Sequence, residues 1–199
     1  PGPDFLYVVE LGGPAAADPT KRPLTPRELA TRISLFLTDT TPSQELLDAA
    51  AAGDLESEEG MRALATEMLQ RPEAREALRG FFGELFELER LPETSKNADA
   101  FPLWNEQLAA DLQESAFLYI DDIVWERDAD YREMLDGDYV YVNNNVATVY
   151  DVAPPGGSDF ARITVPGYQL RNGIMGHAGM MSLLSHIAKT SPTKRGVFV

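Results

Sequence analysis

The two histidines, His177 and His186, are the side chains of this chain best suited to acid–base or metal chemistry, and both lie in its last quarter. A metal site needs a third ligand, and the neighbouring sequence offers none. A non-covalent haem needs only an axial ligand, which either histidine or a nearby methionine could supply. We interpret both histidines as side chains packed on a Gly- and Met-rich helix. The alternative is that His177, His186 and Arg171 face a cofactor.

Nucleophilic catalysis finds little support. Ser182, Ser185 and Ser191 lie close to the histidines in the sequence, but no acid in that segment can orient a base. The sequence has no G-x-S-x-G elbow and no glycine-rich phosphate loop. It has no cysteine, which excludes thiolate catalysis and covalent attachment of c-type haem within this stretch. We therefore do not expect this chain alone to be an enzyme.

Acidic side chains crowd the stretch from Asp121 to Asp138. A calcium loop needs oxygen ligands at alternating positions, a glycine for its sharp turn and a closing glutamate. Asp128-Ala129-Asp130 is followed by Tyr131-Arg132, so the glycine and the third ligand are missing. We predict no metal site here and interpret these acids as a solvated helix end.

The segment Thr190-Ser191-Pro192-Thr193-Lys194-Arg195-Gly196 combines hydroxyls at a predicted helix start with two bases one turn further on. Such a start can hold an anion, so Thr190, Ser191, Lys194 and Arg195 are candidates for docking an anion or a partner. The alternative is a capped helix whose two bases pair with acids of the same chain.

Charge is unevenly distributed along the chain. The net charge is -15, and all 32 acids precede residue 160, whereas residues 160–199 carry five bases and no acid. An acidic body argues against nucleic-acid binding, which needs a basic footprint. We expect the basic tail to dock on the acidic body or on an anionic partner. No apolar run reaches the length of about 18 residues that a membrane span needs.

Hydrophobic periodicity predicts a mainly α domain of seven or eight helices. A capping box, Thr25-Pro26-Arg27-Glu28, starts the first, and the longest runs from about Asn105 to about Glu126. Alternating residues predict short strands at 138–142 and 161–165, which could pair as a two-stranded ribbon. We expect residues 1–24 to end a preceding element, residues 25–153 to form the main helical domain, and residues 154–199 to start a second domain whose basic tail packs on the first.

Several segments carry a family resemblance when read in order. They are Asp4-Phe5-Leu6-Tyr7 with Glu10, RELATRISLFL (27–37), ELLDAAAAGDL (45–55), FFGELFELERL (81–91), FPLWNEQLAADLQES (101–115), DYVYVNNNVATVY (138–150) and RNGIMGHAGMMSLLS with TSPTKRG (171–196). The chain resembles domain-of-unknown-function families 1592 and 1588, which are adjacent domains of large exported proteins of planctomycetes and myxobacteria. It departs from that pattern at Glu84-Leu85-Phe86, where Gln-Trp is usual, and helix 27–37 lacks the common Tyr and Trp.

The resemblance implies a parent protein that is exported to the periplasm or the cell surface and is similar to c-type cytochromes. A C-x-x-C-H motif usually follows in that family, so haem c is expected downstream and no cofactor within this chain. The leading hypothesis is a non-catalytic scaffold or docking domain in electron transfer, with other domains of the same protein or a redox partner protein as its partners.

Two alternatives stay open at this stage. In one, the chain forms a wall of an oxidoreductase active site that the downstream haem segment completes. In the other, it is a binding module for polysaccharide or a cell-surface partner, and it uses Trp104, Trp125, Tyr139 and Tyr141. The spacing of these aromatic residues is more typical of core positions on helices and strands.

Overall fold

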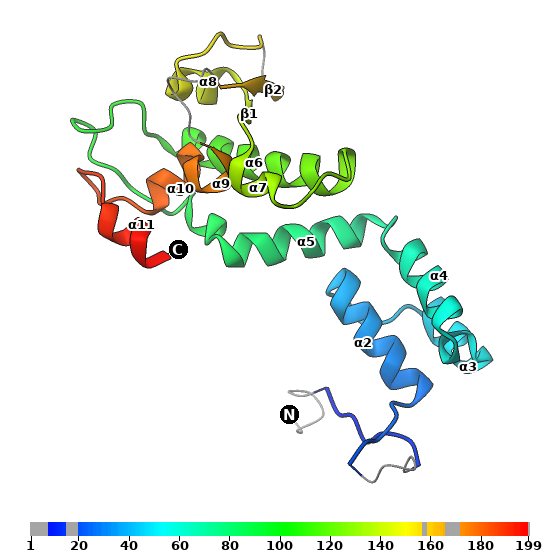
Figure 1. The fold of residues 1–199 in the computed structure, drawn as a ribbon. Coiled ribbons are helices and arrows are strands. Elements are labelled where there is room, and N and C mark those ends of the chain that lie inside the picture. Colours follow the sequence, from blue (N-terminus) through cyan, green and yellow to red (C-terminus); the bar gives the residue numbers. More distant parts are fainter. Residues whose placement is uncertain (1–7, 15–19, 157–158, 166–171, 199) are drawn as a thin grey trace. The chain divides into compact units, whose positions relative to one another are not determined.

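The computed structural model describes residues 8–14, 20–156, 159–165 and 172–198 (Figure 1). The chain divides into two compact units, Pro1–Leu78 and Arg79–Val199, which are called unit 1 and unit 2 here. The division falls inside helix α5 (Pro72–Leu85). Of the predicted features, Asp4-Phe5-Leu6-Tyr7 and Arg171 lie outside the described residues.

Unit 1 is built from short helices that follow one another closely. They are α2 (Pro26–Thr38), α3 (Gln44–Ala52), the 3₁₀ turn η1 (Asp54–Glu56) and α4 (Glu58–Met68), and the first part of α5 follows. Hydroxyl side chains start three of them, because Thr25, Ser43 and Ser57 each accept a backbone N–H from the first turn. Gly53 ends α3 in the left-handed conformation, with φ of 92°.

The main core cluster of unit 1 is apolar. Its buried members are Ala30, Leu46, Ala50, Leu55 and Met68, and half-buried aliphatic side chains of α2, α3 and α4 surround them. These residues lie three and four positions apart along their helices, as the stripe of an amphipathic helix requires. Hydrophobic burial therefore holds this unit, and Ser34 and Thr38 on α2 are its buried polar side chains among the described residues.

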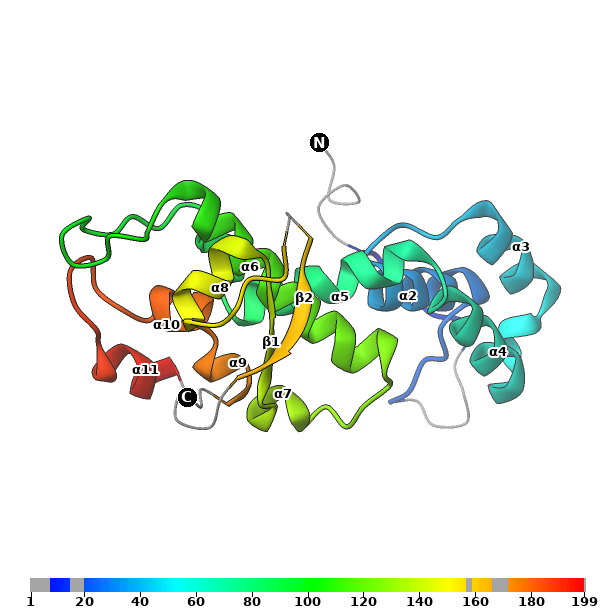
Figure 2. The ribbon, with the colours of Figure 1, turned by 90° about the horizontal axis from the view of Figure 1, so that it is seen from above.

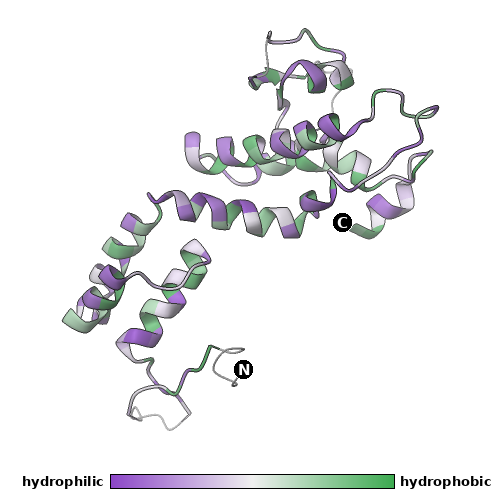
Figure 3. Cartoon of the chain, turned by 180° about the vertical axis from the view of Figure 1, so that it is seen from behind, coloured by the Kyte–Doolittle hydropathy of each residue, from purple (hydrophilic) through white to green (hydrophobic). Residues whose placement is uncertain are grey.

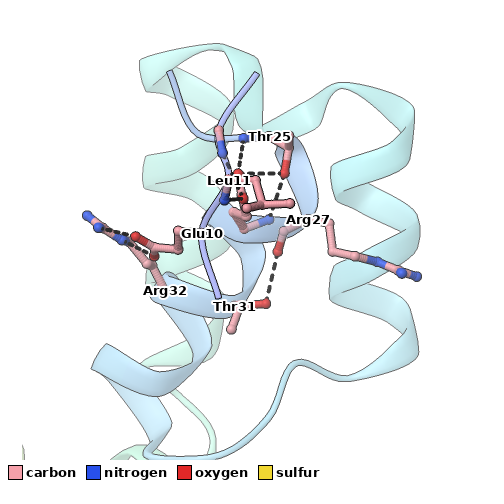
Figure 4. Close-up of polar contacts among 8 residues, drawn as sticks. Glu10, Leu11, Thr25, Arg27, Thr31 and Arg32 are labelled. Carbon is pink, nitrogen blue, oxygen red and sulfur yellow. Dashed lines mark hydrogen bonds and ion pairs between the residues drawn. The ribbon is translucent and has the colours of Figure 1, made fainter. Parts of the chain in front are cut away.

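An extended segment runs along the start of α2 and is fixed to it by one carboxylate (Figure 4). Glu28 accepts the backbone N–H groups of Leu11 at 2.6 Å, Gly12 at 3.0 Å and Thr25 at 2.7 Å. Arg32 pairs with both oxygens of Glu10. The hydrogen bonds from Thr25 and Gly12 lower the pKa of Glu28 to about 2. Glu28 thus closes the predicted capping box and also anchors the segment that precedes the helix.

Unit 2 begins with the second part of α5 and contains the longest helix, α6 (Glu106–Asp121). The other elements are the 3₁₀ turn η2 (Leu88–Arg90), the wide turn η3 (Asp122–Glu126), α7 (Glu133–Asp136), β1 (Tyr139–Val142), α8 (Asn144–Tyr150), β2 (Ala161–Thr164), α9 (Gly173–Gly176), α10 (Ala178–Leu183) and α11 (Pro192–Phe198). Polar and apolar residues alternate along α5 and α6, which marks both as amphipathic (Figure 3).

The two strands pair antiparallel, with Tyr139 opposite Thr164 and Val142 opposite Ala161 (Figure 2). Strand β1 packs on α6, and α8 follows it directly. A core of Leu108, Leu112, Val142, Val146 and other buried side chains fills the space between these elements. The ribbon of β1 and β2 therefore packs on α6 through β1.

Helix α6 continues into a π-helical turn. In η3 the backbone N–H of Arg127 donates to the carbonyl of Asp122 at 3.0 Å, five residues back. Such turns are rare and are frequently found at functional sites. The predicted helix from about Asn105 to about Glu126 therefore exists as one α-helix followed by one wide turn.

The predicted fold class is confirmed, since the described chain is mainly helical with one small antiparallel sheet. Among the described residues, no helix combines the length and the apolar character that crossing a bilayer requires. The predicted domain boundaries stay predictions.

Candidate functional site

His177 lies at the centre of unit 2 and is 1% exposed. Its Nδ1 atom accepts the backbone N–H of Gly179 at 3.1 Å, which caps the start of α10. Its Nε2 atom lies 2.9 Å from Ser115 Oγ, and that hydroxyl donates in turn to the carbonyl of Tyr141. The backbone N–H of Ala178 donates to the Tyr150 hydroxyl at 2.7 Å.

These contacts fix the state of the imidazole. Because Nδ1 accepts and Ser115 has already given its proton to a carbonyl, Nε2 must carry the proton and donate to Ser115. Burial lowers the pKa of His177 to about 4, so the ring is neutral near pH 7. Both ring nitrogens are occupied by protein groups, and the arrangement links α6, β1 and α10.

A second polar network gathers around the wide turn η3. Asp122 is buried, and it accepts Arg127 Nε at 2.7 Å and the Tyr141 hydroxyl at 3.0 Å. Burial alone would raise the pKa of Asp122, but the hydrogen bonds from Arg127, Tyr139 and Tyr141 outweigh it and lower the pKa. Arg127 also binds both oxygens of Glu133. The acids and bases of this network are paired with one another. The network therefore holds the ribbon of β1 and β2 to the turn η3 at the end of α6.

The aromatic residues weighed as a binding platform take part in internal contacts. Tyr139 is buried, with its ring centroid 4.9 Å from that of Tyr119 and the Arg162 guanidinium 3.8 Å above it. Trp104 packs against the core of unit 2 and donates to the carbonyl of Thr94 at 3.0 Å. Tyr141 and Trp125 are half-buried.

Two lysine side chains of unit 2 come together on neutral oxygens. Lys96 Nζ donates to the carbonyl of Ser182 and to Ser185 Oγ, both at 2.7 Å, and Lys194 Nζ donates to the carbonyl of Ser185 at 3.2 Å. We call Lys96 and Lys194, with the oxygens of Ser182 and Ser185, the lysine cluster. Burial lowers the pKa of Lys96, and the nearby Lys194 ammonium lowers it further.

The lysine cluster forms no ion pair with an acid that the structure describes. Among the described residues, no ion pair includes Lys96, Lys189, Lys194 or Arg195. The two ammonium groups donate to neutral oxygens, and Lys96 Nζ also lies 5.9 Å from the ring centroid of Phe101 and 5.8 Å from that of Trp104. The chain as a whole is nevertheless strongly acidic. This local excess of positive charge favours an anionic group from outside the cluster.

The four predicted docking residues have distinct environments. Ser191 is buried and its Oγ accepts the backbone N–H of Lys194 at 3.2 Å, which caps the start of α11. Thr190 is exposed, and Arg195 Nη1 lies 3.6 Å from Met181 Sδ. Lys194 belongs to the lysine cluster. The helix is therefore capped as the alternative reading held, but its bases do not pair with acids among the described residues.

The three predicted cofactor-facing residues are not brought to one described place. His177 is buried, His186 is exposed on the loop after α10, and Arg171 lies outside the described residues. In the part of the chain that the structure describes, no three His, Asp or Glu side chains are grouped to hold a metal ion.

Sequence reasoning missed Ser115 and Lys96, which complete the two polar groups. Ser115 follows Leu108 and Leu112 and precedes Tyr119 on the core stripe of α6. A hydroxyl on an apolar stripe indicates a buried hydrogen-bond partner, so the sequence carried a signal for this contact. Lys96 stands in a loop, and no local pattern marks it, because its partners lie 86 to 90 residues further along the chain.

Fold and site together define a mainly α-helical domain that combines a neutral, fully bonded interior histidine with a cluster of lysines on neutral oxygens. The chain belongs to the family PSD4, protein of unknown function (DUF1592), whose profile matches residues 24–152. The match thus covers most of unit 1 and the part of unit 2 up to the second residue after α8. No curated protein and no solved structure is detectably similar to the chain.

Proposed function

We propose that this chain is a non-catalytic scaffold and docking domain of a larger exported protein that carries haem c and transfers electrons. The family resemblance supports the exported haem context, and the geometry supports the docking role. The observation that carries the docking role is the lysine cluster, whose ammonium groups face no carboxylate among the described residues.

Docking through this cluster follows from simple electrostatics. Lys96 already donates to Ser182, Ser185 and, at 3.4 Å, to the carbonyl of His186, so its three N–H groups are occupied. Lys194 makes one such bond, which leaves two N–H groups for an incoming carboxylate. An acidic partner would gain charge-assisted hydrogen bonds there and would relieve the repulsion between the two lysines.

The non-catalytic part rests on how the interior side chains are used. His177, the interior group best suited to acid–base work, has both nitrogens bonded to Ser115 and Gly179. The carboxylate of Asp122 is bonded to Arg127 and Tyr141. Groups that are used up in this way hold the fold rather than act on a substrate.

The test is carbodiimide cross-linking of the intact parent protein, because this reagent joins lysines to carboxylates that touch them. We expect Lys194 and Lys189 to become joined to acidic residues outside residues 1–199, and Lys194→Met to lose its cross-link. The matched control is Lys21→Met, a change in the other unit, which leaves those cross-links intact. Cross-links confined to residues 1–199 would refute docking, and an absorption spectrum without haem would refute the electron-transfer context.

A further inference from the structure

A small cavity with mixed polar and apolar walls opens in unit 1, between the end of α2 and the start of α3. Its volume is about 100 Å³. Five hydroxyl side chains line it: Ser34, Thr38, Thr40, Thr41 and Ser43. The buried side chains of Leu46 and Met68 complete it on the apolar side, and Arg71 and Glu73 reach it from the α4–α5 junction. We call this cavity the hydroxyl pocket.

The hydroxyl network leaves hydrogen-bond acceptors open. Thr38 Oγ1 donates to the carbonyl of Ser34 at 2.8 Å and lies 2.8 Å from Thr40 Oγ1. Because the single proton of Thr38 goes to that carbonyl, Thr40 must donate to Thr38. The lone pairs of Thr40 remain available, and Thr40 is exposed, so a ligand can reach them.

The same pocket offers open hydrogen-bond donors. Ser43 Oγ accepts the backbone N–H of Leu46 at 3.2 Å, and its own proton is uncommitted. Arg71 donates through Nη2 to Glu45 at 3.2 Å and to Glu67 at 2.8 Å. Its Nε and Nη1 groups make no hydrogen bond to the described residues, although its side chain is only 31% exposed. The pocket therefore presents donors and acceptors within one small volume.

Charge decides which ligand fits. Arg71 is already paired with two carboxylates, and Glu73 lines the pocket as well, so the local balance is negative and repels an anion. Five of the nine lining side chains are neutral hydroxyls, and no metal-binding group of acids is present among the described residues. A neutral ligand that both donates and accepts, as an alcohol does, satisfies the pocket.

Volume decides how much of the ligand enters. A dry cavity of about 150 Å³ holds a benzene molecule, so a cavity of about 100 Å³ suits roughly four heavy atoms. We propose that the hydroxyl pocket binds a vicinal diol, as presented by glycerol or by the edge of a sugar ring. This site lies in unit 1 and is independent of the docking role proposed for the lysine cluster in unit 2.

The test is a titration of the chain with glycerol, followed by amide chemical shifts. We expect saturable shifts confined to residues near Thr40, Thr41 and Leu46, and much smaller ones with 1-propanol, which lacks the second hydroxyl. Replacing Thr40 by valine keeps the shape but removes the lone pairs, and it should weaken binding by about fivefold, the usual effect of one hydrogen bond. Thr66→Val, at an exposed hydroxyl of α4 in the same unit, is the matched control and leaves binding unchanged.

Three results would overturn the proposal. The first is glycerol shifts that are spread over the surface or that never saturate, which would mean that the pocket holds only water. The second is equal binding by the Thr40→Val variant, provided that its circular dichroism matches the parent. The third is tighter binding of sulfate than of glycerol, which would make the pocket an anion site.

Discussion

Unit 1 and unit 2 use their polar side chains over different distances along the chain. In unit 1 the helix caps join residues three apart, as between Thr25 and Glu28, and the longest separation among the described side-chain bonds is 26 residues, between Arg71 and Glu45. In unit 2 the bonds that matter span long stretches of chain, with 62 residues between Ser115 and His177 and 42 between Arg79 and Asp121. Local bonds tolerate independent change, whereas long-range bonds tie the fate of one element to another. The comparison predicts that single substitutions are more damaging in unit 2.

The largest effect is expected from Gly173→Ala in unit 2. Gly173 has φ of +60°, and a Cβ there would lie 2.3 Å from the backbone carbon of Leu135. Since neither backbone can yield cheaply, we expect unit 2 to lose more than about 3 kcal/mol of unfolding free energy. Hydrogen exchange of the unit 2 amides measures this loss.

The control for this change is Gly80→Ala on α5, where an added Cβ meets nothing within 4 Å. Alanine is the better helix former, so this variant should be at least as stable as the parent. If the Gly173→Ala variant were as stable as the Gly80→Ala variant, α7 and α9 would not pack as closely as the structure shows.

A drop in pH should weaken unit 2 through His177. Its pKa is lowered from 6.5 to about 4 in the folded chain, so the unfolded chain binds the proton more readily. The stabilisation is therefore complete above pH 6.5 and is lost as the pH falls from 6.5 towards 4, on the order of 3 kcal/mol in all. Urea unfolding at several pH values, followed through unit 2 signals, checks this.

A matched pair of variants assigns the effect to this residue. His177→Gln should flatten the pH dependence of unit 2 stability between pH 6.5 and 4, whereas His186→Gln, at an exposed position, should retain it.

The stability of unit 1 depends on pH over a different range, because Glu28 has a pKa of about 2 in the folded chain against 4.5 ordinarily. The stabilisation that Glu28 contributes is present above pH 4.5 and is lost between pH 4.5 and 2. Identical pH profiles of stability for both units would contradict the proposed difference between them.

The smallest effect is expected from Thr25→Ala in unit 1. This change removes the cap of α2 and one hydrogen bond to Glu28, and it should cost about 1 kcal/mol in unit 1 alone. Thr31→Ala is the control, because Thr31 donates only to the carbonyl of Arg27 within the same helix (Figure 4). Unfolding curves recorded on signals from each unit would show a loss in unit 1 for the first variant and none for the second.

The same contrast explains what the sequence could predict. The capping box at Thr25 and the two short strands depend on neighbouring residues, and the structure contains them. The lysine cluster and the bond between Ser115 and His177 depend on which distant segments meet, and periodicity carries no such information. The wide turn η3 was also missed, because a helix with one extra residue in a turn keeps a nearly helical pattern.

The residues of the candidate site also differ in how far the sequence could predict them. The sequence favoured packing of both histidines, and the structure buries His177 but leaves His186 exposed, so that prediction is wrong for His186. Lys194 was named for its place after Ser191, but its neighbour Lys96 was not, since a lone base in a loop has no distinguishing pattern. The hydroxyl pocket went unnoticed because the serines and threonines of residues 34–43 read as helix and turn residues.

The anchoring of the extended segment on α2 also determines how the chain carries mechanical load. A pull applied at Val8 would first stretch the bonds from Leu11 and Gly12 to Glu28 and the pair between Glu10 and Arg32. All of these bonds end on Glu28 and Arg32, which are four residues apart on α2. The tension would end in the first two turns of one helix, and the apolar core of unit 1 would be shielded from it.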